Sequence, residues 1–232
     1  MALAARVVLG VDTASRTAGI ALADENGILE ELYLEDTKAR GERLADLCSQ
    51  ALTARGLVAS DLCGVGVCVG PGSYTGLRVG LSFARGIALV DDLPTIGVGS
   101  LELLALAARR GAANRPMYAA IGAGRDRVYA AAYQAGSGDA DFKEIAEPHV
   151  VPSGEIAEAA ARFPDVVFCH ESGLTPPPEI ANRIEVPEGR VGLLAVTAMR
   201  RLARSEGMPA EAILPTYVGA TNARKNRNRV IL

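Results

Sequence analysis

The sequence predicts an α/β protein with two similar halves, each a mixed sheet flanked by helices. A three-strand meander followed by a helix, a strand and a second helix occupies residues 7–90, and a weaker copy of this order follows residue 100. The chain of 232 residues is 49% hydrophobic, which suffices for a large core. We therefore divide it into residues 1–100 and 101–232, with a helix start at Ser100 between them.

Short apolar runs predict the strands of the first half. Residues 7–11 form a compact apolar run, and two further runs, 17–23 and 28–34, flank Asn26-Gly27, a dipeptide typical of hairpin turns. Over residues 40–55, apolar side chains recur at the spacing of one helix face, which predicts a helix. These side chains are Leu44, Leu47, Cys48, Ala51 and Leu52.

The second half repeats this order less clearly. Its predicted elements are strands at 116–121, 127–133 and 142–151, a helix at 153–162, a strand at 166–169 and a helix at 191–205.

The stretch from Gly70 to Gly80 holds four glycines and one proline in eleven residues. It follows a strand-like run at 65–69 and leads into a helix-like run. Glycines allow a sharp turn and a close approach, and Ser73 or Thr75 can cap the helix. Because the free N–H groups at a helix start attract anions, the loop is a candidate phosphate cradle. A tight turn without a ligand explains the same residues, and both interpretations stay open at this point.

The loop sequence GPGSYTGLRVG closely resembles the GPGS(F/Y)TGLR signature of the bacterial TsaB (YeaZ) family. Residues 9–15, LGVDTAS, resemble the apolar strand ending in Asp-Thr-Ser/Ala that this family carries, and the likeness extends over nearly the whole chain. The resemblance implies the actin/hexokinase-like fold (ASKHA, ribonuclease H-like), in which the meander unit occurs twice. It also implies an accessory, non-catalytic role in forming threonylcarbamoyladenosine next to the anticodon of tRNA.

The same resemblance implies specific partners. TsaB-like proteins pair with a catalytic TsaD-like protein through their first two helices, here 40–55 and 75–90, and a TsaE-like ATPase then joins the pair. A homodimer through the same helices is an alternative that the sequence does not separate. We assign the partner contact to Arg43, Leu44, Leu47, Ala51, Gly80, Ala84, Arg85 and Ala88.

Small residues recur at every fourth position of the second of these helices. They are Gly76, Gly80, Ala84 and Ala88. Such a stripe admits another backbone at short distance. Packing against the chain's own sheet is favoured over contact with a partner helix.

Asp12 and Thr13 end the first strand, where relatives with this fold handle phosphate or magnesium. A role of Asp12 in accepting turn N–H groups is slightly favoured over a metal-bound water. We place a degenerate phosphate site at Asp12, Thr13, Gly70, Gly72, Ser73, Thr75 and Gly76.

The second half departs from the family pattern. Where the family usually has Asp-Ala-Arg, this chain has Gly122, Ala123 and Gly124, which argues against tight ATP binding. We therefore expect that no cofactor is required, and weak ATP or ADP binding at a partner interface stays open. The same departure argues against the alternative function, a small-molecule kinase or other nucleotide-binding enzyme of this fold.

We expect no catalytic residue and no metal site. The two histidines, His149 and His170, form no HxxxH or HExxH pattern. Ser73 lacks the flanking glycines of a nucleophile elbow, because Pro71 and Thr75 occupy those positions.

Composition limits the location and the ligands. No apolar run approaches 18 residues, so we expect no membrane span, and the four cysteines without a CxxC pair are typical of free thiols in a reducing cytoplasm. The net charge of −3 argues against the whole protein as a polyanion binder. The basic residues within 224–229 leave an indirect or weak contact with tRNA open.

Overall fold

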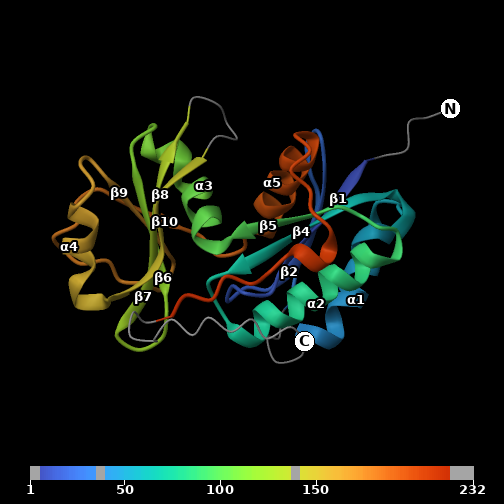
Figure 1. Ribbon diagram of the computed structural model, residues 1–232, viewed down its shortest axis with the longest axis horizontal. Coiled ribbons are helices and arrows are strands. Elements are labelled where there is room, and N and C mark those ends of the chain that lie inside the picture. The colour runs from blue at the N-terminus through green and yellow to red at the C-terminus, as the bar shows by residue number, and fades with distance from the viewer. Residues whose placement is uncertain (1–5, 35–39, 137–141, 220–232) are drawn as a thin grey trace.

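The computed structural model describes residues 6–34, 40–136 and 142–219, and in these ranges the chain forms two five-stranded mixed sheets (Figure 1). The first sheet contains β1 (Val7–Asp12), β2 (Gly19–Asp24), β3 (Gly27–Tyr33), β4 (Leu62–Gly70) and β5 (Thr95–Gly99). The second contains β6 (Met117–Gly122), β7 (Arg127–Ala135), β8 (Phe142–Pro152), β9 (Val167–Glu171) and β10 (Arg183–Val186).

Both sheets have the same topology. The order is β3-β2-β1-β4-β5 in the first and, in the same sense, β8-β7-β6-β9-β10 in the second. In each sheet the first three strands pair antiparallel as a meander, and the last two run parallel to the first. This repeat confirms the predicted architecture of two similar halves.

Helices cover both faces of each sheet. On the first sheet, α1 (Arg40–Ala54) and α2 (Tyr74–Val90) pack on one face and α5 (Val191–Ala203) on the other. On the second sheet, α3 (Ser100–Ala112) packs on the inner face and the short α4 (Ile156–Ala161) on the outer face. None of these described helices has the length and apolar content needed to cross a bilayer.

The two halves exchange helices. Although α3 follows β5 of the first sheet, it packs on the second sheet, and although α5 follows β10 of the second sheet, it packs on the first. Both helices therefore lie between the sheets (Figure 1). The last strand of the first sheet ends at Gly99 and α3 begins at Ser100. The division of the chain into domains at residue 100 stays a prediction.

The structure also shows elements that the sequence analysis missed. β5 and β10 were not predicted, and the predicted helix at 153–162 starts as a 3-10 turn at Ser153–Glu155 before α4 begins. β10 is a four-residue edge strand with alternating charged residues, and β5 carries two glycines, so neither shows the apolar run that marks a buried strand.

The cysteines are free thiols, as predicted. Cys48, Cys68 and Cys169 are buried, and Cys63 is half-buried. Burial raises the pKa of the Cys169 thiol to about 12, so this thiol stays protonated near neutral pH.

Glycines allow α5 to approach the first sheet closely. A Cβ on Gly10 of β1 would lie 2.8 Å from the Cβ of Ala195, and a Cβ on Gly66 of β4 would lie 2.5 Å from the Cβ of Ala198. Both distances are far below van der Waals contact, and an alanine Cβ cannot rotate away. The sheet and the helix can therefore meet only because both surfaces are nearly without side chains.

We expect Gly10→Ala to lower the free energy of unfolding by roughly 1–3 kcal/mol, because the new methyl group overpacks this contact. The matched control is Gly86→Ala in α2, where a Cβ meets nothing within 4 Å. This control should be stabilising by about 0.5–1 kcal/mol, since alanine favours a helix over glycine. Urea denaturation of both variants measures the two effects. Equal stability of the variants would show that the α5 contact is loose.

Candidate functional site

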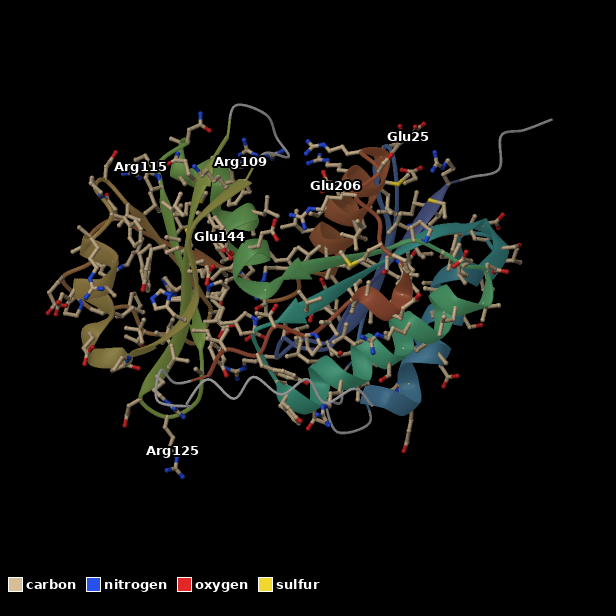
Figure 2. All side chains as sticks on the ribbon, in the orientation of Figure 1. Glu25, Arg109, Arg115, Arg125, Glu144 and Glu206 are labelled. Carbon is tan, nitrogen blue, oxygen red and sulfur yellow. The ribbon has the colours of Figure 1, made fainter. Side chains whose placement is uncertain are left out.

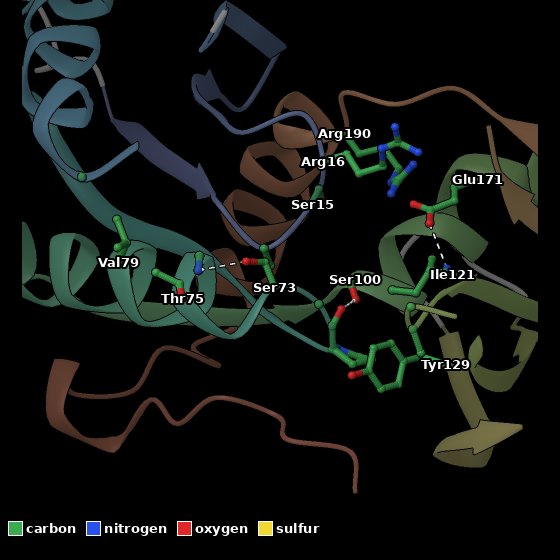
Figure 3. Close-up of a pocket in the computed structure, with 18 residues that line it drawn as sticks. Ser15, Arg16, Ser73, Thr75, Val79, Ser100, Ile121, Tyr129, Glu171 and Arg190 are labelled. Atoms are coloured by element: carbon green, nitrogen blue, oxygen red, sulfur yellow. Dashed lines mark hydrogen bonds between the residues drawn. The ribbon is translucent and has the colours of Figure 1, made fainter. Parts of the chain in front are cut away.

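A cavity of about 560 Å³ opens between the two halves, where β1 ends and α2 begins (Figure 3). The first half contributes the turn after β1, the glycine loop and Ser100. The second half contributes the turn after β6, Tyr129 and Glu171, and Arg190 precedes α5. The lining residues are Ala14, Ser15, Arg16, Gly41, Pro71, Gly72, Ser73, Thr75, Gly76, Val79, Ser100, Ile121, Gly122, Ala123, Gly124, Tyr129, Glu171 and Arg190.

The glycine loop holds the start of α2 at this cavity. Ser73 caps the helix, since its Oγ accepts a hydrogen bond from the Gly76 N–H at 3.1 Å, as predicted. The Ser73 N–H donates to the carbonyl of Ala14 at 3.0 Å, and a Cβ on Gly72 would lie 2.6 Å from the same oxygen. The loop and the end of β1 therefore touch, which confirms the expected proximity, while anion binding by the loop stays a prediction.

The carboxylate of Asp12 is occupied by its own turn. Asp12 is buried, and its Oδ1 accepts hydrogen bonds from the N–H groups of Ala14 at 2.9 Å and Ser15 at 3.2 Å. Its Oδ2 accepts from the Ser15 hydroxyl at 2.6 Å. These contacts favour the turn role over a metal-bound water, and Asp12 does not line the cavity.

Thr13 ties the same turn to α2. Its buried hydroxyl donates to the carbonyl of Gly76 at 2.6 Å. A Cβ on Gly80 would collide with this hydroxyl oxygen, so the glycine leaves room for it. Of the predicted phosphate-site residues, Gly72, Ser73, Thr75 and Gly76 line the cavity, and Asp12, Thr13 and Gly70 lie behind its wall.

Three charged cavity residues were missed by the sequence analysis. Arg190 is 7% exposed and donates to the carbonyl of Pro187 at 2.9 Å, and the Nε of Arg16 lies 3.5 Å from Oε1 of Glu188. Glu171 accepts a hydrogen bond from the Gly122 N–H at 3.0 Å. Figure 3 shows both arginines on the side of the cavity that Glu171 borders. Two cations and the positive end of α2 together favour a small anionic group here.

The predicted partner residues fall into two groups. Leu44, Leu47, Ala51, Gly80, Ala84 and Ala88 are all buried within the chain's own core. The apolar faces of α1 and α2 are turned toward the first sheet, so a partner cannot touch these six residues without displacing the helices. Arg43 is exposed, and Arg85 donates to the carbonyl of Ile213.

A different face of α1 and α2 is exposed to solvent. Its exposed residues include small ones, Ala45 and Ser49 of α1 and Ser82 and Gly86 of α2, beside charged ones such as Glu42 and Asp46. The last turn of α2 adds Leu89 and Val90, which are 65% and 79% exposed. We call the four small residues, together with Leu89 and Val90, the outer helix face.

Metal ligands do not gather in the described ranges, where no group of three or more His, Cys, Asp or Glu residues could hold an ion. His149 lies on β8 and His170 on β9, and these strands are not neighbours in the second sheet.

Comparisons with known proteins match this chain to one family. The family model described as "TsaD: tRNA N6-adenosine threonylcarbamoyltransferase" matches residues 28–163, more than half of the chain. The chain is 33% identical over 127 residues to the tRNA threonylcarbamoyladenosine biosynthesis protein TsaB of Escherichia coli, covering 55% of this chain and 54% of the relative. It is 36% identical over 98 residues to TsaB of Bacillus subtilis, covering 42% and 43%.

A solved structure of YeaZ from Pseudomonas aeruginosa superposes on 92% of this chain and 100% of its own, with a TM-score of 0.76 and 25% identity. The chain belongs to the TsaB (YeaZ) family. The match to YeaZ also confirms the fold class, two actin-like halves. The aligned segments span about half the length of the curated TsaB relatives.

The role of Asp12 can be tested with two substitutions. In Asp12→Asn, the remaining oxygen still accepts from the turn N–H groups, and the Ser15 hydroxyl can rotate to accept from the new amide. We expect this variant to lose less than about 1 kcal/mol of unfolding free energy. Asp12→Ala leaves three donors without an acceptor and should lose about 2 kcal/mol or more. Equal losses in urea denaturation would show that the negative charge, rather than the acceptor geometry, is what the site needs.

Proposed function

We propose that this TsaB-family protein is a non-catalytic partner of a TsaD-like enzyme in forming threonylcarbamoyladenosine on tRNA. The observation that carries the proposal is the similarity to proteins named for threonylcarbamoyladenosine biosynthesis, joined to a match with YeaZ over the whole fold. The cytoplasm is the proposed location, as the sequence analysis expects.

The chemistry of the cavity supports a role without catalysis. The hydroxyl of Ser15 donates to Asp12, that of Ser100 donates to the Pro71 carbonyl, and that of Ser73 caps α2. Neither histidine is among the residues that line the cavity. Among the described lining residues, none of these three serine hydroxyls is therefore paired with a histidine, as acyl transfer by an activated serine would require.

Nucleotide binding, if it occurs in this cavity, is proposed to be weak. The start of α2, Arg16 and Arg190 offer positive charge to a phosphate. Gly122 and Gly124 offer a phosphate no side chain, and the carboxylate of Glu171 adds a negative charge on the side of the cavity where the two arginines lie. The positive charge at the cavity is therefore partly offset.

The outer helix face is the proposed contact with the TsaD-like protein. Its small side chains permit close approach of another helix, and the exposed Leu89 and Val90 supply apolar area that water would otherwise cover. A second copy of this chain is the competing occupant, and a TsaE-like ATPase is proposed to join the assembled pair. Contact with tRNA through residues 224–229 lies outside the described residues.

Reconstitution tests the function. The purified protein alone should not transfer threonylcarbamoyl to tRNA, whereas addition of the TsaD-like and TsaE-like proteins, with a supply of the activated threonylcarbamoyl donor, should form the modified nucleoside. Omission of this protein from the mixture should abolish or strongly reduce the product, which nucleoside chromatography measures. Product formation by the isolated protein would refute the accessory role.

Ala45→Arg tests the partner surface. We expect it to weaken association with the TsaD-like protein about 10- to 100-fold, because the contact must bury a large charged side chain without a partner. The matched control is Ala161→Arg, an exposed alanine at the end of α4 on the outer side of the second sheet. Both variants should melt like the wild type. If Ala45→Arg binds the TsaD-like protein normally, the partner surface lies elsewhere.

A further inference from the structure

A second hollow, of about 370 Å³, lies between the halves at the helices α3 and α5. Among the described residues that line it, four of ten are arginines and one carries a carboxylate. The residues are Glu102, Leu106, Ala107, Arg109, Arg110, Leu193, Val196, Thr197, Arg200 and Arg201. We call this hollow the arginine groove. On a chain with a net charge of −3, it is a local concentration of positive charge.

The exchange of helices creates this concentration. Arg109 and Arg110 lie in the last turn of α3, and Arg200 and Arg201 lie in the last turn of α5. Arginines are favoured at a helix end by the helix dipole, which explains each pair separately. The helix dipole does not explain why the two pairs line the same groove. They do so because α3 and α5 both pack between the sheets. Figure 2 shows Arg109 on the side of α3 and Glu206 just beyond α5.

Two of the arginines are held in place. Arg201 donates to Glu102 and to the carbonyl of Gly97 at 3.3 Å. Arg109 donates to the carbonyl of Gly136 at 3.2 Å and lies 5.8 Å from the centre of the Phe142 ring.

The other two arginines, Arg110 and Arg200, are exposed at the rim of the groove. Neither forms an ion pair with any residue that the structure describes. The groove thus presents two arginines held by hydrogen bonds and two that are exposed to solvent.

Carboxylates offset part of this charge. Glu102 is the one carboxylate among the lining residues, and it is paired with Arg201. Glu206 lies 4.0 Å from Arg201 and 3.8 Å from Arg204, outside the groove lining. Burial, followed by the charges of Glu147 and Glu102, raises the pKa of Glu144, so a further carboxylate interacts with Glu102.

We propose that the arginine groove binds the phosphate backbone of RNA. Guanidinium groups match phosphate oxygens with paired donors, and clustered arginines on one face are the electrostatic mark of such a surface. A protein partner would be expected to find exposed large apolar side chains, and in the described ranges none of these lines the groove. That the RNA is a tRNA rests on the proposed function.

The position of the groove is compatible with the proposed assembly. The groove is built on α5, which covers one face of the first sheet, while the outer helix face belongs to α1 and α2 on the opposite face. A protein bound at α1 and α2 therefore leaves the arginines accessible to RNA.

The test is the double variant Arg110→Gln/Arg200→Gln, titrated with an unmodified tRNA transcript by fluorescence anisotropy. The full chain is used both alone and with its TsaD-like partner. Loss of two phosphate contacts should weaken binding roughly 20- to 60-fold at 0.1 M salt. It should also reduce the slope of log K against log salt concentration by about 1.4–1.8. Both arginines are exposed, so the melting temperature should stay that of the wild type.

The matched control is Arg162→Gln/Arg183→Gln, which removes two exposed arginines from the second sheet's side of the molecule. It should bind the transcript like the wild type. The proposal is overturned if the groove variant keeps the affinity and the salt slope of the wild type, or if both double variants lose affinity equally. It is overturned as well if the wild-type chain shows no salt-dependent RNA binding either alone or with its TsaD-like partner. It is also overturned if a polyglutamate peptide binds the groove more tightly than RNA, which would identify an acidic protein as the ligand.

The partner role is measured separately, by association of the same variants with the TsaD-like protein. If the wild type does not associate, the proposed function fails, and the RNA titration of the isolated chain still decides the groove.

Discussion

The close approach of α5 to the first sheet is the contact on which the rest of the molecule depends. It requires Gly10 and Gly66 on the strands and Ala195 and Ala198 on the helix, because any larger pair would separate the two surfaces. α5 follows the last strand of the second sheet, so this contact fixes the position of one half relative to the other. A helix of 13 residues is about 20 Å long, and α5 therefore spans the junction between the halves. Its beginning brings Arg190 to the cavity, and its last turn brings Arg200 and Arg201 to the arginine groove.

At the cavity, hydrogen bonds join the turn after β1 to the glycine loop. Strand, turn and glycine loop are all in place, and α2 begins at the cavity with a serine cap. The Asp12 carboxylate, however, accepts three hydrogen bonds from its own turn. A carboxylate whose oxygens are already occupied has little capacity left to bind a metal or activate a water. The hydroxyl of Thr13 donates to the carbonyl of Gly76 and so ties the end of β1 to the start of α2.

Local patterns predicted most elements but not their neighbours. The apolar run of β1, the Asn26-Gly27 turn and the spacing in α1 each depend on residues close in sequence, and all three are confirmed. The same spacing shows that one face of α1 is buried, but not against what, which is why residues such as Leu44 were assigned to a partner and lie in the chain's own core. The cavity charges were missed for a related reason. Arg16 and Arg190 are 174 positions apart, and only the helix exchange brings them to one cavity.

The helix exchange also separates the surfaces that the protein offers to others. α1 and α2 shield one face of the first sheet and leave a side with small residues to solvent, whereas α5 shields the other face and carries arginines at its last turn. A protein on the first surface and a polyanion on the second would not compete for space. They would act on each other only through the sheet between them, which is rigid because both of its faces are packed. The two faces of one sheet could therefore be occupied by a protein and a polyanion at the same time.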